Sequence, residues 1–127
     1  MLKNTQIRAF HVMAKPTGSV CNLNCRYCFY LEKEVYYPQP HIMRDNVLES
    51  YVRSYIESTY PDDEVAFSWQ GGEPALAGLE FYQQAVSLQH KYGAGRKITN
   101  NFQTNGILLN EAWCQFFADN DFLIGLS

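Results

Sequence analysis

The chain has 127 residues, of which 46% are hydrophobic and 18% charged, and its formal net charge is −3. This composition excludes a disordered chain and argues against a nucleic acid or an acidic membrane surface as a partner held by bulk charge. No apolar run approaches the ~18–20 residues of a membrane span, and no apolar segment follows Lys3 and Arg8 as in a secretion signal, so a cytoplasmic protein is expected.

The first predicted elements are a strand and a helix separated by a long loop. Alternating apolar residues predict a strand over 8–15, and the loop behind it carries three cysteines. An apolar stripe predicts a helix over 46–59, which we expect to begin with a capping box formed by Asn46 and Glu49.

The remainder of the chain continues the alternation of strands and helices. Apolar periodicity and turn residues predict strands over 64–69, 98–104 and 122–126, a helix over 78–92, and a further helix capped by Asn110. We therefore expect an α/β fold with about four parallel strands and three helices, which is about half of a (β/α) barrel. Because the last strand ends the chain, we expect residues 1–127 to be the truncated N-terminal part of a larger protein.

Three of the four cysteines, Cys21, Cys25 and Cys28, lie within eight residues in the spacing C-x₃-C-x₂-C. Three thiolates this close suit a 4Fe–4S cluster whose fourth iron is open, whereas zinc sites usually have four protein ligands. A zinc-binding module or three structural thiols are the alternatives that the spacing leaves open. The fourth, Cys114, lies among aromatic residues of the last helix and is expected to be a buried, inert thiol.

Polar residues follow each predicted strand at its carboxyl end. Residues 70–74 (Gln-Gly-Gly-Glu-Pro) follow the second strand, residues 103–106 (Gln-Thr-Asn-Gly) end the third, and Ser127 ends the fourth. Paired glycines let a backbone turn sharply and approach a ligand closely, although simple turns are the alternative for both loops. Since the reactive groups of (β/α) barrels gather at this end, we expect these residues to share one site with the cysteines.

The cysteine spacing, with Tyr27 as the aromatic residue before the last thiol, resembles the cluster motif of radical S-adenosylmethionine (SAM) enzymes, and residues 71–74 resemble the GGEP loop of that family. The resemblance implies a partial (β/α)₆ TIM-like barrel, of which this chain is the N-terminal half. It implies a 4Fe–4S cluster on the three cysteines, where reductive cleavage of S-adenosylmethionine gives a 5′-deoxyadenosyl radical. The implied cofactor-binding residues are Tyr27 at the adenine, Gly71, Gly72 and Glu73 at the amino group, and Gln70, Asn105 and Ser127.

The wider sequence resembles anaerobic sulfatase-maturating enzymes over residues 14–16, 21–34, 69–78 and 103–110, with Ala75 a minor departure from the usual Thr. These enzymes oxidise a Cys or Ser of a sulfatase polypeptide to Cα-formylglycine, and an electron donor such as flavodoxin or ferredoxin is implied. Their auxiliary clusters and catalytic base would lie beyond Ser127, so the chain alone is expected to be inactive on a sulfatase. The nearer alternative is a related radical SAM enzyme that modifies a different peptide.

Overall fold

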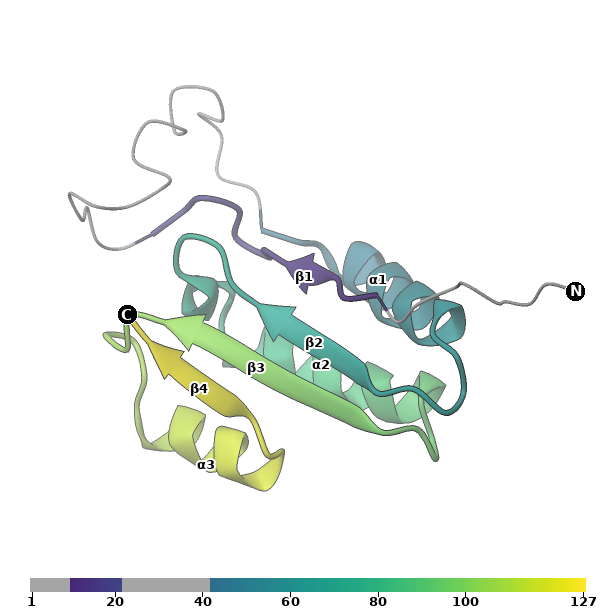
Figure 1. The fold of residues 1–127 in the computed structure, drawn as a ribbon. Helices are drawn as coiled ribbons and strands as arrows, with labels where there is room; N and C mark the ends of the chain where they lie inside the picture. Colours follow the sequence, from purple (N-terminus) through teal and green to yellow (C-terminus); the bar gives the residue numbers. More distant parts are fainter. Residues whose placement is uncertain (1–9, 22–41) are drawn as a thin grey trace, which may run out of the picture.

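The computed structural model describes residues 10–21 and 42–127, which form a four-stranded parallel sheet with three α-helices (Figure 1). The sheet has the strand order β1-β2-β3-β4, so each strand lies beside its neighbour in sequence. The elements are β1 (Met13–Ala14), α1 (Asp45–Ser58), β2 (Val65–Trp69), the 3₁₀ helix η2 (Pro74–Ala77), α2 (Leu79–Tyr92), β3 (Ile98–Thr104), α3 (Glu111–Asp119) and β4 (Leu123–Leu126).

The three α-helices pack on one face of this sheet. Phe67, Trp69 and Phe102 share that face, because Trp69 and Phe102 are register partners and successive side chains alternate along a strand. Aromatic rings of α1 and α2 contact Trp69, and rings of α2 and α3 contact Phe102. Consecutive parallel strands with every helix on one side are the arrangement of a partial TIM-like barrel, which confirms the predicted fold class.

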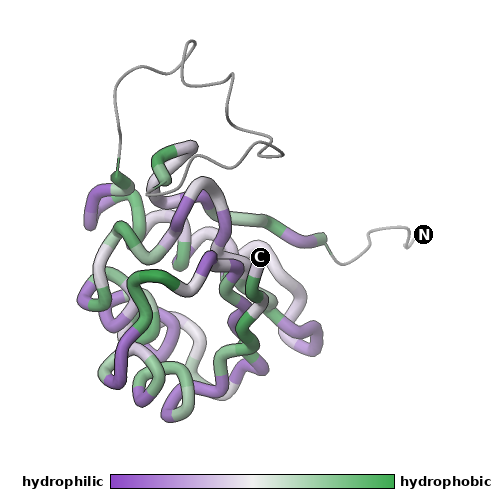
Figure 2. Tube along the Cα trace, turned by 90° about the vertical axis from the view of Figure 1, so that its left-hand side faces the viewer, coloured by the Kyte–Doolittle hydropathy of each residue, from purple (hydrophilic) through white to green (hydrophobic). Residues whose placement is uncertain are grey.

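The core between the sheet and the helices is largely aromatic. The ring of Tyr82, on α2, lies 4.9 Å from Phe102 and 5.5 Å from Trp69, in edge-on geometry with both. Burying each such side chain stabilises the fold by roughly 1.5–3 kcal/mol relative to leaving it exposed. Hydrophobic and hydrophilic residues alternate along the helices in Figure 2, as this one-sided burial requires. Within the described residues, no helix is both long and apolar enough to cross a bilayer.

The predicted strand 8–15 begins outside the described residues, and within residues 10–15 only Met13 and Ala14 pair with β2. Just before them, the backbone of Val12 is bound by two tyrosines of α1. Its N–H donates to the hydroxyl of Tyr55 and its carbonyl accepts from the hydroxyl of Tyr51, both at 3.3 Å. Burial, followed by the nearby Tyr55, raises the pKa of Tyr51, so its hydroxyl stays protonated as a donor.

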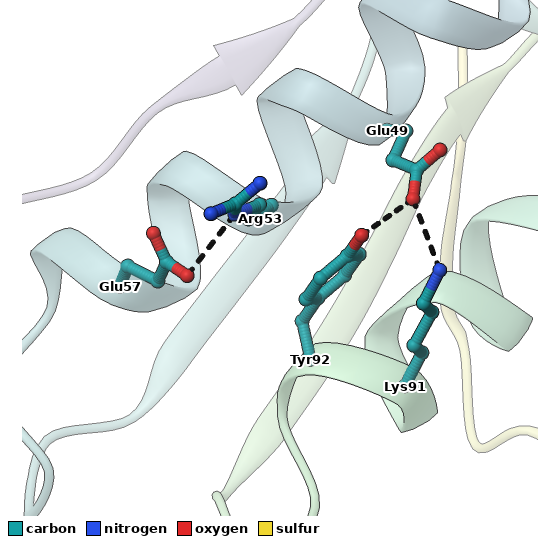
Figure 3. A network of polar contacts seen from close by, with 5 residues as sticks. All are labelled: Glu49, Arg53, Glu57, Lys91 and Tyr92. Carbon is teal, nitrogen blue, oxygen red and sulfur yellow. Dashed lines mark hydrogen bonds and ion pairs between the residues drawn. The ribbon is translucent and has the colours of Figure 1, made fainter.

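Helix α1 begins within one residue of its predicted start, but the predicted capping box is wrong. Its N-cap is Arg44, which makes no side-chain cap, and the carboxylate of Glu49 turns instead toward α2 (Figure 3). There it accepts hydrogen bonds from Tyr92 and Lys91, which hold the pKa of Glu49 below its usual value. Glu49 therefore joins two helices rather than capping its own.

The later elements lie close to their predicted bounds, with one correction in α3. Asn110 caps that helix as predicted, its side chain accepting a hydrogen bond from the backbone of Trp113 at 3.1 Å. The thiol of Cys114, however, is free and its residue is exposed, so the expectation of a buried thiol is wrong. The buried stripe of α3 consists of Trp113, Phe116 and Phe117, and a residue adjacent to Trp113 points about 100° away from it.

Candidate functional site

The turn after β1 brings Cys21 to the carboxyl edge of the sheet. The N–H of Gly18 donates to the carbonyl of Lys15, and the N–H of Val20 donates to the carbonyl of Thr17, which folds residues 15–20 into two successive turns. Gly18 has a φ of +58°, a left-handed conformation that glycine adopts without strain. Cys21 follows directly and is half-buried.

The glycine loop after β2 lies against this turn. The N–H of Gly72 donates to the carbonyl of Gly18 at 2.8 Å, and that of Glu73 donates to the carbonyl of Val20 at 2.7 Å. A Cβ on Gly72 would stand 2.2 Å from the Val20 oxygen, and one on Gly71, where φ is +121°, would stand 2.7 Å from the Gly18 oxygen. The paired glycines are therefore needed for a close approach to the segment before Cys21.

The carboxylate of Glu73 lies inside the molecule, where its exposed fraction is 0%. Its Oε2 accepts hydrogen bonds from the backbone N–H of Ala75 at 2.9 Å and the hydroxyl of Thr104 at 2.7 Å. Its Oε1 accepts one from the backbone N–H of Asn105 at 2.8 Å. The side chain therefore joins the loop after β2 to the loop after β3.

Two buried hydroxyls support the same loop. Thr17 donates to the main-chain carbonyl of Glu73 at 3.2 Å, so a residue of the β1 turn also binds here. Tyr82 of α2 donates to the carbonyl of Pro74 at 2.7 Å. Burial, with the Glu73 carboxylate as the second cause, raises the pKa of Tyr82 well above its usual value, which keeps this hydroxyl a donor.

Asn105 reaches across the same edge to the cysteine. Its side-chain Nδ2 donates to the Sγ of Cys21 at 3.7 Å, a normal distance for a sulfur acceptor. Ser127 extends β4 at this edge, where its N–H donates to the carbonyl of Thr104 at 3.0 Å. Gln70 extends β2, and its N–H donates to the carbonyl of Ala14 at 2.9 Å.

The structure thus brings together the described residues that the sequence assigned to one site, namely Cys21, Gln70, Gly71, Gly72, Glu73, Asn105 and Ser127. Cys25, Cys28 and Tyr27 lie outside the described residues. Within the described ranges, no group of three or more Cys, His, Asp or Glu side chains gathers that could hold a metal ion. The assigned ligand roles of all ten residues therefore stay predictions.

Two residues of the site, Thr17 and Thr104, were given no individual role from the sequence. Each is almost fully buried and binds Glu73, Thr17 to its main chain and Thr104 to its side chain. Thr104 lies inside the predicted polar segment 103–106, so its position at a strand end was a usable signal. Thr17 stands between Pro16 and Gly18 in an ordinary turn sequence, which carries no such signal.

A surface pocket lies at the opposite edge of the sheet, between the ends of α2 and α3. Its lining includes Gln89, Asn100, Arg96 and Asp121. Gln89 and Asn100 bind one another, and Asn100 also accepts from the indole N–H of Trp69, so their amides serve the core. Because this pocket contains none of the predicted site residues, the candidate site remains the carboxyl edge.

Comparison with known proteins identifies the family of this chain. The family model of the radical SAM superfamily matches residues 16–127, and the chain belongs to that superfamily. The chain is 48% identical over 123 residues to a serine-type anaerobic sulfatase-maturating enzyme of Bacteroides thetaiotaomicron, covering 94% of this chain and 29% of that enzyme. It is 45% identical over 119 residues to a cysteine-type anaerobic sulfatase-maturating enzyme of Clostridium perfringens, covering 91% of this chain and 32% of that enzyme.

Solved structures show the same similarity. The structure of native anSMEcpe with bound AdoMet and the Kp18Cys peptide matches with a TM-score of 0.81 and 43% identity, covering 91% of this chain and 31% of that one. The same protein with AdoMet alone matches with a TM-score of 0.80 and 44% identity, covering 90% of this chain and 30% of that one. The chain thus spans less than a third of the length of these solved chains.

Proposed function

We propose that this chain is the radical-generating part of an oxidoreductase of the anaerobic sulfatase-maturating type. Cys21, Cys25 and Cys28 would hold a 4Fe–4S cluster, and the residues of the carboxyl edge would hold S-adenosylmethionine. When bound, the reduced cluster supplies the electron that cleaves S-adenosylmethionine to a 5′-deoxyadenosyl radical. The observation that carries the proposal is the set of hydrogen bonds that gathers Cys21, Gly72, Glu73 and Asn105 at one edge.

The described part of the site fits these groups chemically. Cys21 presents a half-buried sulfur that accepts an N–H hydrogen bond, as a metal-bound sulfur can. Within the described part of the chain, the carbonyl oxygens of Gly71 and Gly72 accept no backbone hydrogen bond, so they are available acceptors for the cofactor's amino group. Glu73 would act beside them by holding the loop. Tyr27 would lie against the adenine, and Gln70, Asn105 and Ser127 would line the remaining pocket.

The test is anaerobic reconstitution of the chain with iron and sulfide. We expect a brown protein with 4Fe–4S stoichiometry, whose reduced form gives an EPR signal that S-adenosylmethionine alters. Cys25→Ala should lose this signal, because two thiolates remain for three irons. Cys114→Ala, on the exposed surface of α3, is the matched control and should retain it. A colourless, EPR-silent chain that binds stoichiometric zinc would instead establish the zinc-binding module.

The proposed reaction is oxidation of a sulfatase Cys or Ser to Cα-formylglycine in the cytoplasm, with electrons exchanged through a flavodoxin or ferredoxin. It is supported by the similarity to both serine-type and cysteine-type enzymes. We propose that this reaction also needs groups found in the other two-thirds of those relatives, including auxiliary clusters and a catalytic base.

We therefore expect the reconstituted 127-residue chain to produce no formylglycine in a sulfatase peptide. The readout is the mass of peptides that carry either Cys or Ser at the target position, after incubation with S-adenosylmethionine and reductant. A formylglycine product would show that these residues suffice for the whole reaction. Modification of an unrelated peptide in the same assay would favour the related enzyme with a different substrate.

A further inference from the structure

The side-chain amide of Asn105 is held in one orientation by its neighbours. Its Oδ1 accepts a hydrogen bond from the backbone N–H of Ile107 at 3.0 Å, which identifies this atom as the oxygen. The other end of the amide, Nδ2, must therefore face the Sγ of Cys21, 3.7 Å away. An N–H group is thus aimed at the cysteine sulfur.

The backbone that carries this amide is fixed as well. The N–H of Asn105 donates to the buried Glu73 carboxylate at 2.8 Å. The next residue, Gly106, has a φ of +81°, and its N–H donates to the hydroxyl of Thr104 at 3.1 Å. The loop therefore holds the donor in place before any ligand binds.

The loop geometry alone does not explain why this residue is asparagine. An aspartate would accept the same hydrogen bond from Ile107 and would suit the same turn. Only asparagine adds an N–H donor directed at the sulfur, so the contact with Cys21 distinguishes the two residue types.

We propose that Asn105 tunes the reduction potential of the cluster through the sulfur of Cys21. This inference rests on the proposed function, in which Cys21 is a cluster ligand. Reduction adds one negative charge that is shared with the ligating sulfurs, and an N–H dipole directed at a sulfur stabilises that charge. Asn105 therefore raises the potential and makes the cluster easier to reduce.

The test is a redox titration, monitored by EPR, of the reconstituted chain and its variants. Asn105→Leu should lower the midpoint potential by about 59 mV for one electron, which corresponds to a tenfold smaller equilibrium constant of reduction. Asn105→Asp keeps the bond to Ile107 and replaces the donor by a negative charge, so its midpoint should fall further. Asn101→Asp is the matched control, because it places the same charge four residues earlier on β3, roughly 13 Å away along the strand.

A second measurement detects the proton that Asn105 directs at the sulfur of Cys21. Samples in H₂O and D₂O, compared by electron–nuclear double resonance, should show an exchangeable proton coupled to the reduced cluster that both Asn105 variants lose. Both variants could instead bind the cluster with midpoint potentials within roughly 18 mV of the parent, which is a twofold change in the equilibrium constant of reduction. In that case the inference is wrong and the proposed function stands. A parent chain that binds no cluster would overturn the proposed function itself.

Discussion

Glu73→Leu is expected to lower the free energy of unfolding by about 4 kcal/mol, because it removes the acceptor for three inward-facing donors at once. The N–H groups of Ala75 and Asn105 and the hydroxyl of Thr104 would each lose their bond in a region closed to water. Urea denaturation followed by tryptophan fluorescence measures this loss, since Trp69 lies at the end of β2 next to the loop.

Glu73→Gln separates the loss of hydrogen bonds from the loss of volume. Its amide keeps one oxygen acceptor but turns an N–H₂ group toward a donor, so the expected loss is about 2 kcal/mol. Glu80→Gln, on the exposed first turn of α2, is the control and should change stability by less than about 0.5 kcal/mol. A loss below about 1 kcal/mol for Glu73→Leu would mean that the carboxylate does not hold the two loops together.

Gly72→Ala is expected to lower the free energy of unfolding by about 3 kcal/mol for a different reason, because its new methyl group would clash with backbone carbonyl oxygens. Its new methyl group would stand 2.2 Å from the carbonyl oxygen of Val20 and 2.5 Å from that of Ser19. The segment before Cys21 must then move away, which breaks the hydrogen bonds of the Gly72 and Glu73 N–H groups. Hydrogen exchange at these two amides should therefore accelerate together with the loss of stability.

Gly95→Ala provides the comparison for this substitution. Gly95 has a φ of +80°, but no atom lies within 4 Å of the added Cβ. Only the strain of the left-handed backbone then applies, and the free energy of unfolding is expected to fall by about 1 kcal/mol. Equal costs at the two positions would show that crowding at Gly72 is relieved without breaking the contact with the β1 turn.

The arrangement of the site could be predicted from the sequence, but its internal bonding could not. Polar segments that follow successive parallel strands must meet at one edge, so Gly71, Gly72 and Asn105 could be grouped from strand order alone. The donors to the Glu73 side chain include Thr104 and Asn105, which are 31 and 32 positions away. Such a contact depends on the register of β2 against β3, which no local pattern specifies.

The two wrong predictions about α1 and α3 have the same origin. The pair Asn46 and Glu49 has the spacing of a capping box, but a lysine and a tyrosine of α2 compete for the carboxylate of Glu49. Cys114 directly follows the aromatic Trp113, but the buried stripe of α3 continues from Trp113 to the residues three and four positions on, Phe116 and Phe117, and Cys114 lies outside it. Local patterns located the helices, and long-range contacts decided which side chains each helix uses.

The two tyrosines that bind Val12 also join the first strand to the rest of the sheet. The carbonyl of Ala14 accepts a hydrogen bond from the N–H of Gln70, so the backbone groups of Ala14, and those of Val12 two residues earlier, face β2. The hydroxyl of Tyr55 accepts from the N–H of Val12 and donates to the carbonyl of Ala66 in β2, so it takes the place of a direct bond between the two strands. One side chain of α1 thereby holds the helix, the start of the first strand and β2 together at a single point.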